Sequence, residues 1–264
     1  MTARIHVPDP LAENSRLALS QESAKHLRAL RLRPGDPVRL FDGLGGEYTG
    51  EVLVLGKRDA RVQVNAFVAR ECESPLSITL VQGVSKGERM DFTIQKAVEL
   101  GVSSILPVFT ERSIVQLGGE RLDRRTRHWQ SIAISACEQC GRNRVPSILP
   151  PSALRRALNE LRDEVKLVLD PQGETPPHLP DTTSALTLLV GPEGGLSELE
   201  LNQAQESGFL RWRLGPRILR TETAGMTALA VLQSRHGDLS MNGRRITPCA
   251  TADAVASPAN PDRE

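Results

Sequence analysis

A short apolar strand that runs straight into a glycine-rich turn constrains this fold more than any other feature of the sequence. Leu186–Val190 reads Leu-Thr-Leu-Leu-Val, and Gly191-Pro-Glu-Gly-Gly195 follows it directly. Ser197 and Glu200 then form the S-x-x-E pattern of a capping box, which predicts that a helix begins there. A buried strand, a glycine turn and a capped helix in this order indicate an α/β fold with a mainly parallel sheet.

The same alternation of strand and helix runs through most of the chain from residue 76 onward. Strands are predicted over Leu76–Gln82, Ile105–Phe109 and Lys166–Leu169, and helices over Glu88–Leu100, Leu122–Cys140, Ser197–Glu206 and Thr221–His236. Strands that alternate with helices are typical of a sheet covered on its faces by the intervening helices.

The first part of the chain has a different pattern. After a helix predicted over Ser20–Leu32, with Ser20 as N-cap, short strands are predicted over Val38–Phe41, Glu47–Leu55 and Arg61–Ala69. Closely spaced short strands favour a small antiparallel barrel. We therefore predict a barrel domain over residues 1–73 and an α/β domain over residues 74–240. Residues 241–264 lack a periodic apolar face, and we predict a disordered tail.

Two glycine-containing loops are candidates for a ligand site. The turn at Gly191–Gly195 has neither the dinucleotide fingerprint nor the phosphate-loop pattern, so on its own it also fits a plain connection. Leu214–Ala224 carries Arg217 and Arg220 just before a predicted helix. Thr221 as N-cap would make this an ordinary helix start, but cations are unfavourable at that end of a helix. The two arginines therefore indicate an anionic partner.

A third segment, Ala136–Arg144, concentrates polar groups near the end of a predicted helix. Glu138, Gln139, Arg142, Asn143 and Arg144 can all bond a nucleobase or a phosphate. The segment also contains a single C-x-x-C, but a structural zinc ion needs four ligands and no second pair stands nearby. We predict no metal site.

Charge and composition limit how this chain could bind a nucleic acid. Lys and Arg number 33 against 32 Asp and Glu, and aromatic residues make up 3%. These values argue against a general RNA-coating protein and against a base-stacking surface. Lys25, Arg28 and Arg31 give the first helix a basic face, which is either simply solvated or binds phosphate. With neither an apolar membrane span nor a secretory leader pattern, we expect a cytoplasmic protein.

Together with Lys86–Gly101, the three segments resemble the ribosomal RNA small subunit methyltransferase E family of the SPOUT superfamily. The resemblance extends from about Arg4 to Leu239. It implies a PUA-like RNA-binding barrel, an α/β methyltransferase domain with a deep trefoil knot, and a homodimer. It also implies methylation of uracil N3 in 16S ribosomal RNA (rRNA) with S-adenosylmethionine as cofactor. The assembled small ribosomal subunit is the expected substrate.

The resemblance also implies which residues form each site. The cofactor-binding residues would be Val190, Gly191, Pro192, Glu193, Gly194, Gly195, Leu214, Gly215, Ile218, Leu219, Arg220 and Thr223. The RNA-binding residues would be Arg4 and, as a looser match in charge alone, Lys25, Arg28 and Arg31.

Methylation at uracil N3 needs a base to remove a proton and a cation to stabilise the resulting anion. Glu138, Glu193 and Glu222 are the candidate bases, and the sequence does not rank them. Arg112, Arg142 and Arg220 are the candidate anion-stabilising residues. As plain structural alternatives, Glu222 would cap its helix and Glu193 would fix its loop.

Two other functions fit the same features. A ribose 2′-O-methyltransferase would use a similar cofactor domain. A non-catalytic RNA-binding or ribosome-assembly factor would use the barrel alone, although the two intact glycine loops favour catalysis.

Overall fold

The computed structural model describes residues 2–57, 59–113, 118–174 and 179–239, so the tail predicted for residues 241–264 lies outside the described residues. Two separate sheets account for the described strands. One is formed by residues 3–68 and the other by residues 77–212. None of the described helices is long and apolar enough to cross a membrane.

The N-terminal sheet has the strand order β1-β3-β4-β5-β2. Its strands are β1 (Ala3–His6), β2 (Arg16–Leu19), β3 (Pro37–Phe41), β4 (Glu47–Leu55) and β5 (Ala60–Val68). All neighbours are antiparallel except β1 and β3, which are parallel. The predicted antiparallel arrangement is therefore right for three of the four pairs, and the sequence pattern missed β1 and β2.

Helix α1 (Gln21–Ala29) packs on this sheet through buried Ala24 and Leu27. The Ser20 hydroxyl accepts the Ser23 amide at 3.1 Å, which confirms the predicted N-cap. The helix ends earlier than predicted, because Arg31 adopts a left-handed φ of 61° that cannot continue a right-handed helix.

The C-terminal sheet is entirely parallel, in the order β12-β10-β11-β6-β7-β8, with β9 also paired to β7. Its strands are β6 (Ser77–Gly83), β7 (Ser104–Phe109), β8 (Ser147–Ile148), β9 (Ser152–Ala153), β10 (Lys166–Glu174), β11 (Ala185–Val190) and β12 (Leu210–Trp212). The predicted α/β class with a parallel sheet is confirmed.

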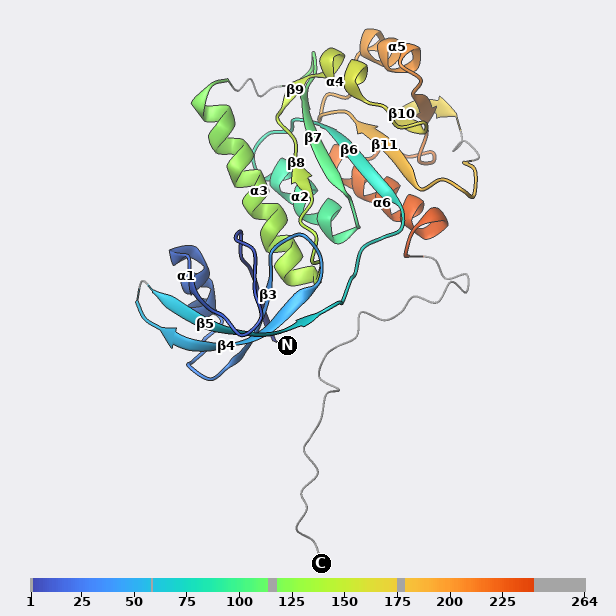
Figure 1. Cartoon of the computed structure of the whole chain (residues 1–264). Coiled ribbons are helices and arrows are strands. Elements are labelled where there is room, and N and C mark those ends of the chain that lie inside the picture. Colours follow the sequence, from blue (N-terminus) through green and yellow to red (C-terminus); the bar gives the residue numbers. More distant parts are fainter. Residues whose placement is uncertain (1, 58, 114–117, 175–178, 240–264) are drawn as a thin grey trace, which may run out of the picture.

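Helices cover both faces of this sheet (Figure 1). One face carries α2 (Glu88–Glu99), α3 (Glu120–Cys140) and α6 (Thr221–His236), and the other carries α4 (Leu154–Glu160) and α5 (Glu198–Glu206). Met90, Trp129 and Leu229 lie in the first of the two cores, and Leu201 lies in the second. Ser197 and Glu200 form the predicted capping box at the start of α5.

Candidate functional site

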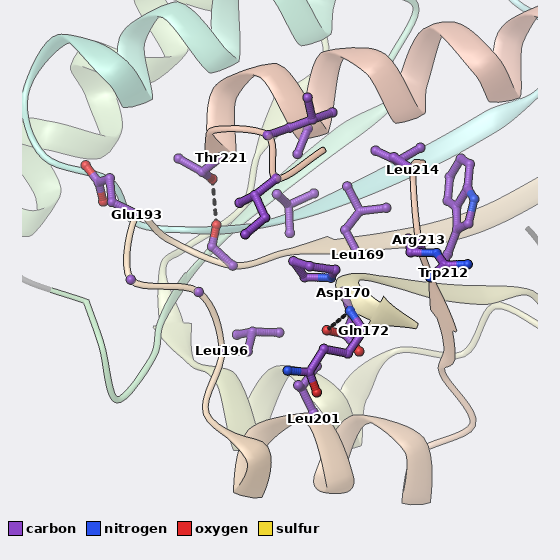
Figure 2. Close-up of a pocket in the computed structure, with 18 of the residues that line it drawn as sticks. Leu169, Asp170, Gln172, Glu193, Leu196, Leu201, Trp212, Arg213, Leu214 and Thr221 are labelled. Carbon is purple, nitrogen blue, oxygen red and sulfur yellow. Dashed lines mark hydrogen bonds between the residues drawn. The ribbon is translucent and has the colours of Figure 1, made fainter. Parts of the chain in front are cut away.

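A cavity of about 420 Å³ lies beyond the carboxyl ends of β10 and β11 (Figure 2). Parallel α/β sheets usually bind ligands at this edge, where the loops that leave neighbouring strands diverge. Both of the predicted glycine loops reach the cavity, one after β11 and the other between β12 and α6. The structure therefore brings together two segments that are about 20 residues apart in the sequence.

Most of the predicted cofactor residues line this cavity. They are Val190, Gly191, Glu193, Gly194, Gly195, Leu214, Gly215, Ile218 and Leu219. Pro192, Arg220 and Thr223, also predicted to bind the cofactor, are not among the residues that line this cavity.

The sequence interpretation missed a third wall, which comes from the end of β10. Leu169, Asp170, Pro171 and Gln172 line the cavity, together with Leu196, Trp212 and Thr221. Strand β10 continues beyond the predicted end at Leu169. The available signal was Asp-Pro-Gln-Gly directly after the apolar run that ends at Leu169, since ligands bind at the carboxyl edge of a parallel sheet.

Thr221 joins the two glycine loops. Its hydroxyl donates to the Gly191 carbonyl at 2.6 Å and accepts a hydrogen bond from Gln82 Nε2 at 3.0 Å. Figure 2 shows the bond from Thr221 across the top of the cavity. The alternative that made Thr221 the N-cap of α6 is wrong, because Arg220 occupies that position and Thr221 is the first helical residue.

Glu193 fixes the outer end of the Gly191–Gly195 loop. Its Oε1 accepts the Lys86 amide at 2.9 Å and an Arg89 guanidinium at 3.3 Å. Partial burial raises the pKa of this carboxyl, but the hydrogen bonds and the Arg89 charge outweigh it, so the pKa is lowered overall. An ionised carboxylate whose acceptor atom is already bonded favours the loop-fixing role over that of a base.

The other candidate catalytic residues near the loops lie in three different positions relative to the cavity. Arg112 lines the cavity, and its Nη1 donates to the Gly194 carbonyl at 3.0 Å. Arg220 is exposed and precedes α6. Glu222 instead lines a separate hollow with Arg89 and Phe92, where its Oε2 is buried without a hydrogen-bond partner among the described residues.

Glu138 does not line the cofactor cavity. It lies in a hollow between α3 and the N-terminal sheet, where its Oε1 accepts the His6 amide at 3.0 Å. Burial raises the pKa of this carboxyl, although the hydrogen bond from His6 opposes the shift. The structure thus gives Glu138 a place at the junction of the two sheets and not beside the cofactor loops.

Replacing Glu138 by Gln tests this placement through stability. The raised pKa means that the folded protein binds the proton more tightly than the unfolded chain does. The stabilisation that the protonated Glu138 gives the folded state is fully present below the ordinary pKa of 4.5. It is lost as the pH rises through the pKa of Glu138 in the folded protein. Glu138→Gln keeps an acceptor for the His6 amide, so its Tm relative to the wild type should rise from acid to neutral pH. Thermal melts across that range measure it.

The same variant also distinguishes a structural role of Glu138 at the junction from a catalytic role as the base. As a residue of the junction, Glu138→Gln should retain methyl transfer within about twofold, because general-base catalysis itself is worth roughly 10²–10⁴-fold. A loss of turnover of that size, with no pH-dependent change in Tm, would restore Glu138 as the base.

Arg142 was predicted to stabilise an anion, but the structure places it elsewhere. It is 6% exposed, and its guanidinium bonds Glu73 and the carbonyls of Val98 and Val102, the last two at 2.9 and 2.8 Å. No cavity described above is lined by Arg142. Its donors are thus used within the fold, and the structure supports a structural role in place of the predicted catalytic one.

Arg4 was predicted to contact RNA, and it too is used internally. It pairs with buried Glu47 and donates to the Arg142 carbonyl at 3.1 Å and to Asn143 Oδ1 at 2.6 Å. Arg70 donates to the same Glu47 carboxylate at 2.9 Å. These bonds join the N-terminal sheet to the end of α3, so Arg4 is a link between the two sheets.

The basic residues of α1 and of the turn after it are not equally exposed. Lys25 and Arg31 are exposed, whereas Arg28 is half-buried and donates to the Gly56 carbonyl at 2.8 Å. Lys25 and Arg31 therefore remain available for a phosphate, and their RNA role stays a prediction.

The C-x-x-C pair at the end of α3 belongs to the core. Cys137 is buried, its Sγ lies 3.7 Å from the Arg144 carbonyl, and burial raises its pKa to about 12. Burial also raises the pKa of the Cys140 thiol. Thiols of high pKa are poor metal ligands, since metals bind the thiolate.

Comparison with known proteins yields matches over nearly the whole chain. The RNA methyltransferase domain model matches residues 72–233, and the RNA methyltransferase PUA domain model matches residues 19–65. The ribosomal RNA small subunit methyltransferase E of Buchnera aphidicola (from Schizaphis graminum) is 37% identical over 90% of this chain and 98% of its own length. The Bacillus subtilis protein of the same name is 30% identical over 84% of this chain and 91% of its own length.

Two solved structures share the fold with a TM-score of 0.87. One is a Neisseria gonorrhoeae ribosomal RNA small subunit methyltransferase E bound to S-adenosylmethionine, at 43% identity over 91% of this chain and all of that one. The other is a Legionella pneumophila protein in complex with the same cofactor, at 39% identity over 90% of this chain and 99% of that one. The predicted combination of a SPOUT-type domain with a preceding PUA-like domain is thereby confirmed.

Proposed function

This chain belongs to the ribosomal RNA small subunit methyltransferase E family, and we propose that it methylates N3 of a uridine in 16S rRNA with S-adenosylmethionine as methyl donor. The proposed substrate is the assembled small subunit in the cytoplasm. The observation that carries the proposal is the cavity between the two glycine loops, at the position where a cofactor is expected in a parallel sheet.

The residues around this cavity suit S-adenosylmethionine. Val190, Leu214 and Leu219 supply apolar surface, and the glycines allow a ligand to approach the backbone. Trp212 also lines the cavity, and its buried Nε1 has no hydrogen-bond partner among the described residues. A polar ligand atom would satisfy this donor. The loops that frame the cavity would be the knot loops of the SPOUT fold.

When bound, S-adenosylmethionine supplies a methyl group on a positively charged sulfonium. The protein has to hold uracil N3 in line with that methyl group and assist loss of the N3 proton. Arg112 at the cavity and exposed Arg220 beside it are the cations that we assign to the uracil anion. Of the candidate bases, Glu193 alone lines the cavity, and its lowered pKa makes it a weak base.

We assign the two parts of the chain separate tasks. The barrel, residues 1–73, would position RNA with Lys25 and Arg31, and residues 74–240 would bind the cofactor and carry out the reaction. We also propose a homodimer. In that dimer the second copy would cover Ile218, an apolar side chain that is 84% exposed on the loop that frames the cavity.

The function is tested by incubating the protein and labelled cofactor with small subunits and, separately, with naked 16S rRNA. Mass spectrometry of the digested RNA should find 3-methyluridine in the subunit sample. A 2′-O-methylated nucleoside would support the ribose methyltransferase, and binding without label incorporation would support the non-catalytic factor.

Arg220→Ala should reduce turnover on saturating small subunits by roughly 10²–10³-fold, as expected when a donor to a developing anion is removed. Cofactor affinity, measured by calorimetry, should stay within about twofold of the wild type, because residue 220 does not line the cavity. Arg220→Lys is the matched variant and should recover part of the turnover. Unchanged turnover in Arg220→Ala would remove this residue from the mechanism.

A further inference from the structure

The first half of α3 carries a concentration of positive charge that the proposed mechanism does not use. Residues 120–128 contain the four arginines Arg121, Arg124, Arg125 and Arg127, followed by His128. Arg121, Arg124 and Arg127 are exposed, and no ion pair joins any of them to a described residue. Unpaired arginines this close together repel one another, so an anionic partner would stabilise them.

Part of this helix borders a cavity of about 530 Å³. Arg121, Arg124, Arg125, His128 and Trp129 line it from α3, and Val84, Ser85 and Gly87 line it from the loop after β6. Trp129 is fully buried, and its Nε1 has no hydrogen-bond partner among the described residues. The cavity therefore combines unpaired cations with an unsatisfied donor, which are the groups that a phosphate would bind.

Arg125 gives this site a fixed framework. Its Nη2 donates to the Gly87 carbonyl at 3.1 Å and pairs with Asp91 at 3.5 Å, and its guanidinium lies 5.7 Å from the centre of the Trp129 ring. Asp91 also bonds His128 at 2.9 Å. Asp91 is thus used by Arg125 and His128, and no ion pair with a described residue engages Arg121 or Arg124.

The loop after β6 connects this cavity with the cofactor cavity. Val84, Ser85 and Gly87 line the α3 cavity, while the amide of Lys86, between them, donates to Glu193 of the glycine loop at 2.9 Å. An RNA strand held on α3 would therefore lie beside the loop that frames the methyl donor.

We propose that Arg121, Arg124 and Arg127, called here the α3 arginine surface, bind backbone phosphates of the rRNA next to the target uridine. This proposal rests on the proposed function and adds a docking site within the α/β domain to that of the barrel. Arginine binds phosphate without reading sequence, so such contacts position the substrate and leave base recognition to other groups. A local cluster also accounts for RNA binding by a chain whose formal net charge is only +1.

The test replaces the three arginines of the surface by glutamine in the full chain. KM for small subunits should rise at least tenfold, and turnover at saturation should stay within about twofold of the wild type. The dependence of log affinity on log salt should become shallower by ~2, since each phosphate contact on single-stranded RNA contributes about 0.7. Cofactor affinity and Tm should be unchanged, because the three side chains are exposed.

The matched control removes three arginines near α4, on the other face of the sheet, as Arg155→Gln, Arg156→Gln and Arg162→Gln. These side chains are also exposed, and their loss should leave KM and the salt dependence unaltered. A triple lysine variant of the α3 arginine surface should keep most of the affinity.

Wild-type KM and salt dependence in the triple glutamine variant would overturn the proposal, as would an equal rise of KM in the control. A wild-type protein that binds the cofactor but methylates no RNA would instead overturn the proposed function.

Discussion

Replacing Gly83 by valine is expected to abolish binding of S-adenosylmethionine, although residue 83 does not line the cofactor cavity. A Cβ atom on residue 83 would lie 2.5 Å from the Pro192 amide nitrogen and 2.9 Å from the Gly191 carbonyl carbon. Both are backbone atoms, which cannot rotate away as a flexible side chain would. The glycine loop would have to move, and the bond between Gly191 and Thr221 would be lost with it.

Calorimetry should find at least a hundredfold weaker binding in Gly83→Val, and Gly83→Ala should fall between this variant and the wild type. Overpacking of this kind also costs about 1–3 kcal/mol of stability, so circular dichroism has to establish that each variant is folded. Gly118→Ala is the matched control, because a Cβ there meets nothing within 4 Å. Wild-type affinity in a folded Gly83→Val protein would mean that the Gly191–Gly195 loop does not shape the cofactor site.

Arg142→Ala should lower the free energy of unfolding by about 3–5 kcal/mol, as expected when one partner of a buried ion pair is removed. The change leaves Glu73 without its cation and leaves the carbonyls of Val98 and Val102 without a donor. Glu73 lies between the two sheets in the sequence, and these bonds join it to α2, the turn after α2 and the end of α3, so the loss affects the junction between the two sheets. Chemical denaturation measures the change.

Arg144→Ala is the control for Arg142→Ala. Arg144 is two residues away but exposed, and its contact with Glu71 is 3.9 Å long. An exposed ion pair contributes about 0–1 kcal/mol, so this variant should unfold almost as the wild type does. A stable Arg142→Ala protein that binds the cofactor yet has lost turnover would contradict the structural role and support the catalytic one.

Local patterns in the sequence were sufficient for much of the fold. The capping box at Ser197 and Glu200, the N-cap at Ser20 and the bounds of α6 are all confirmed. Each depends on residues within about four positions of one another, which is the range over which helix periodicity and capping act. Strands β1, β2, β8, β9 and β12 were missed, because segments of two to four residues are too short to establish a period.

Part of the candidate site could also be predicted, because it depends on local sequence patterns. Both glycine loops are recognisable from their own residues, and both reach the cavity. The other features depend on contacts between segments that are distant in the sequence. They are the cavity wall formed by Asp170–Gln172, the internal hydrogen bonds of Arg4 and Arg142, and the α3 arginine surface. Arg4 and Asn143, for example, are 139 residues apart and joined by a 2.6 Å hydrogen bond.

The strand that precedes Gly191–Gly195 shows what the sequence determined and what the tertiary structure determined. By itself the sequence determined that a buried strand, a glycine turn and a capped helix follow one another, because each is specified by neighbouring residues. Only the tertiary structure decided what faces that turn. The order β12-β10-β11-β6 brings the end of β10 and the loop before α6 beside it, while Glu138 and Arg142 are held at the junction with the N-terminal sheet. Strand order depends on packing over the whole domain, which no local pattern encodes.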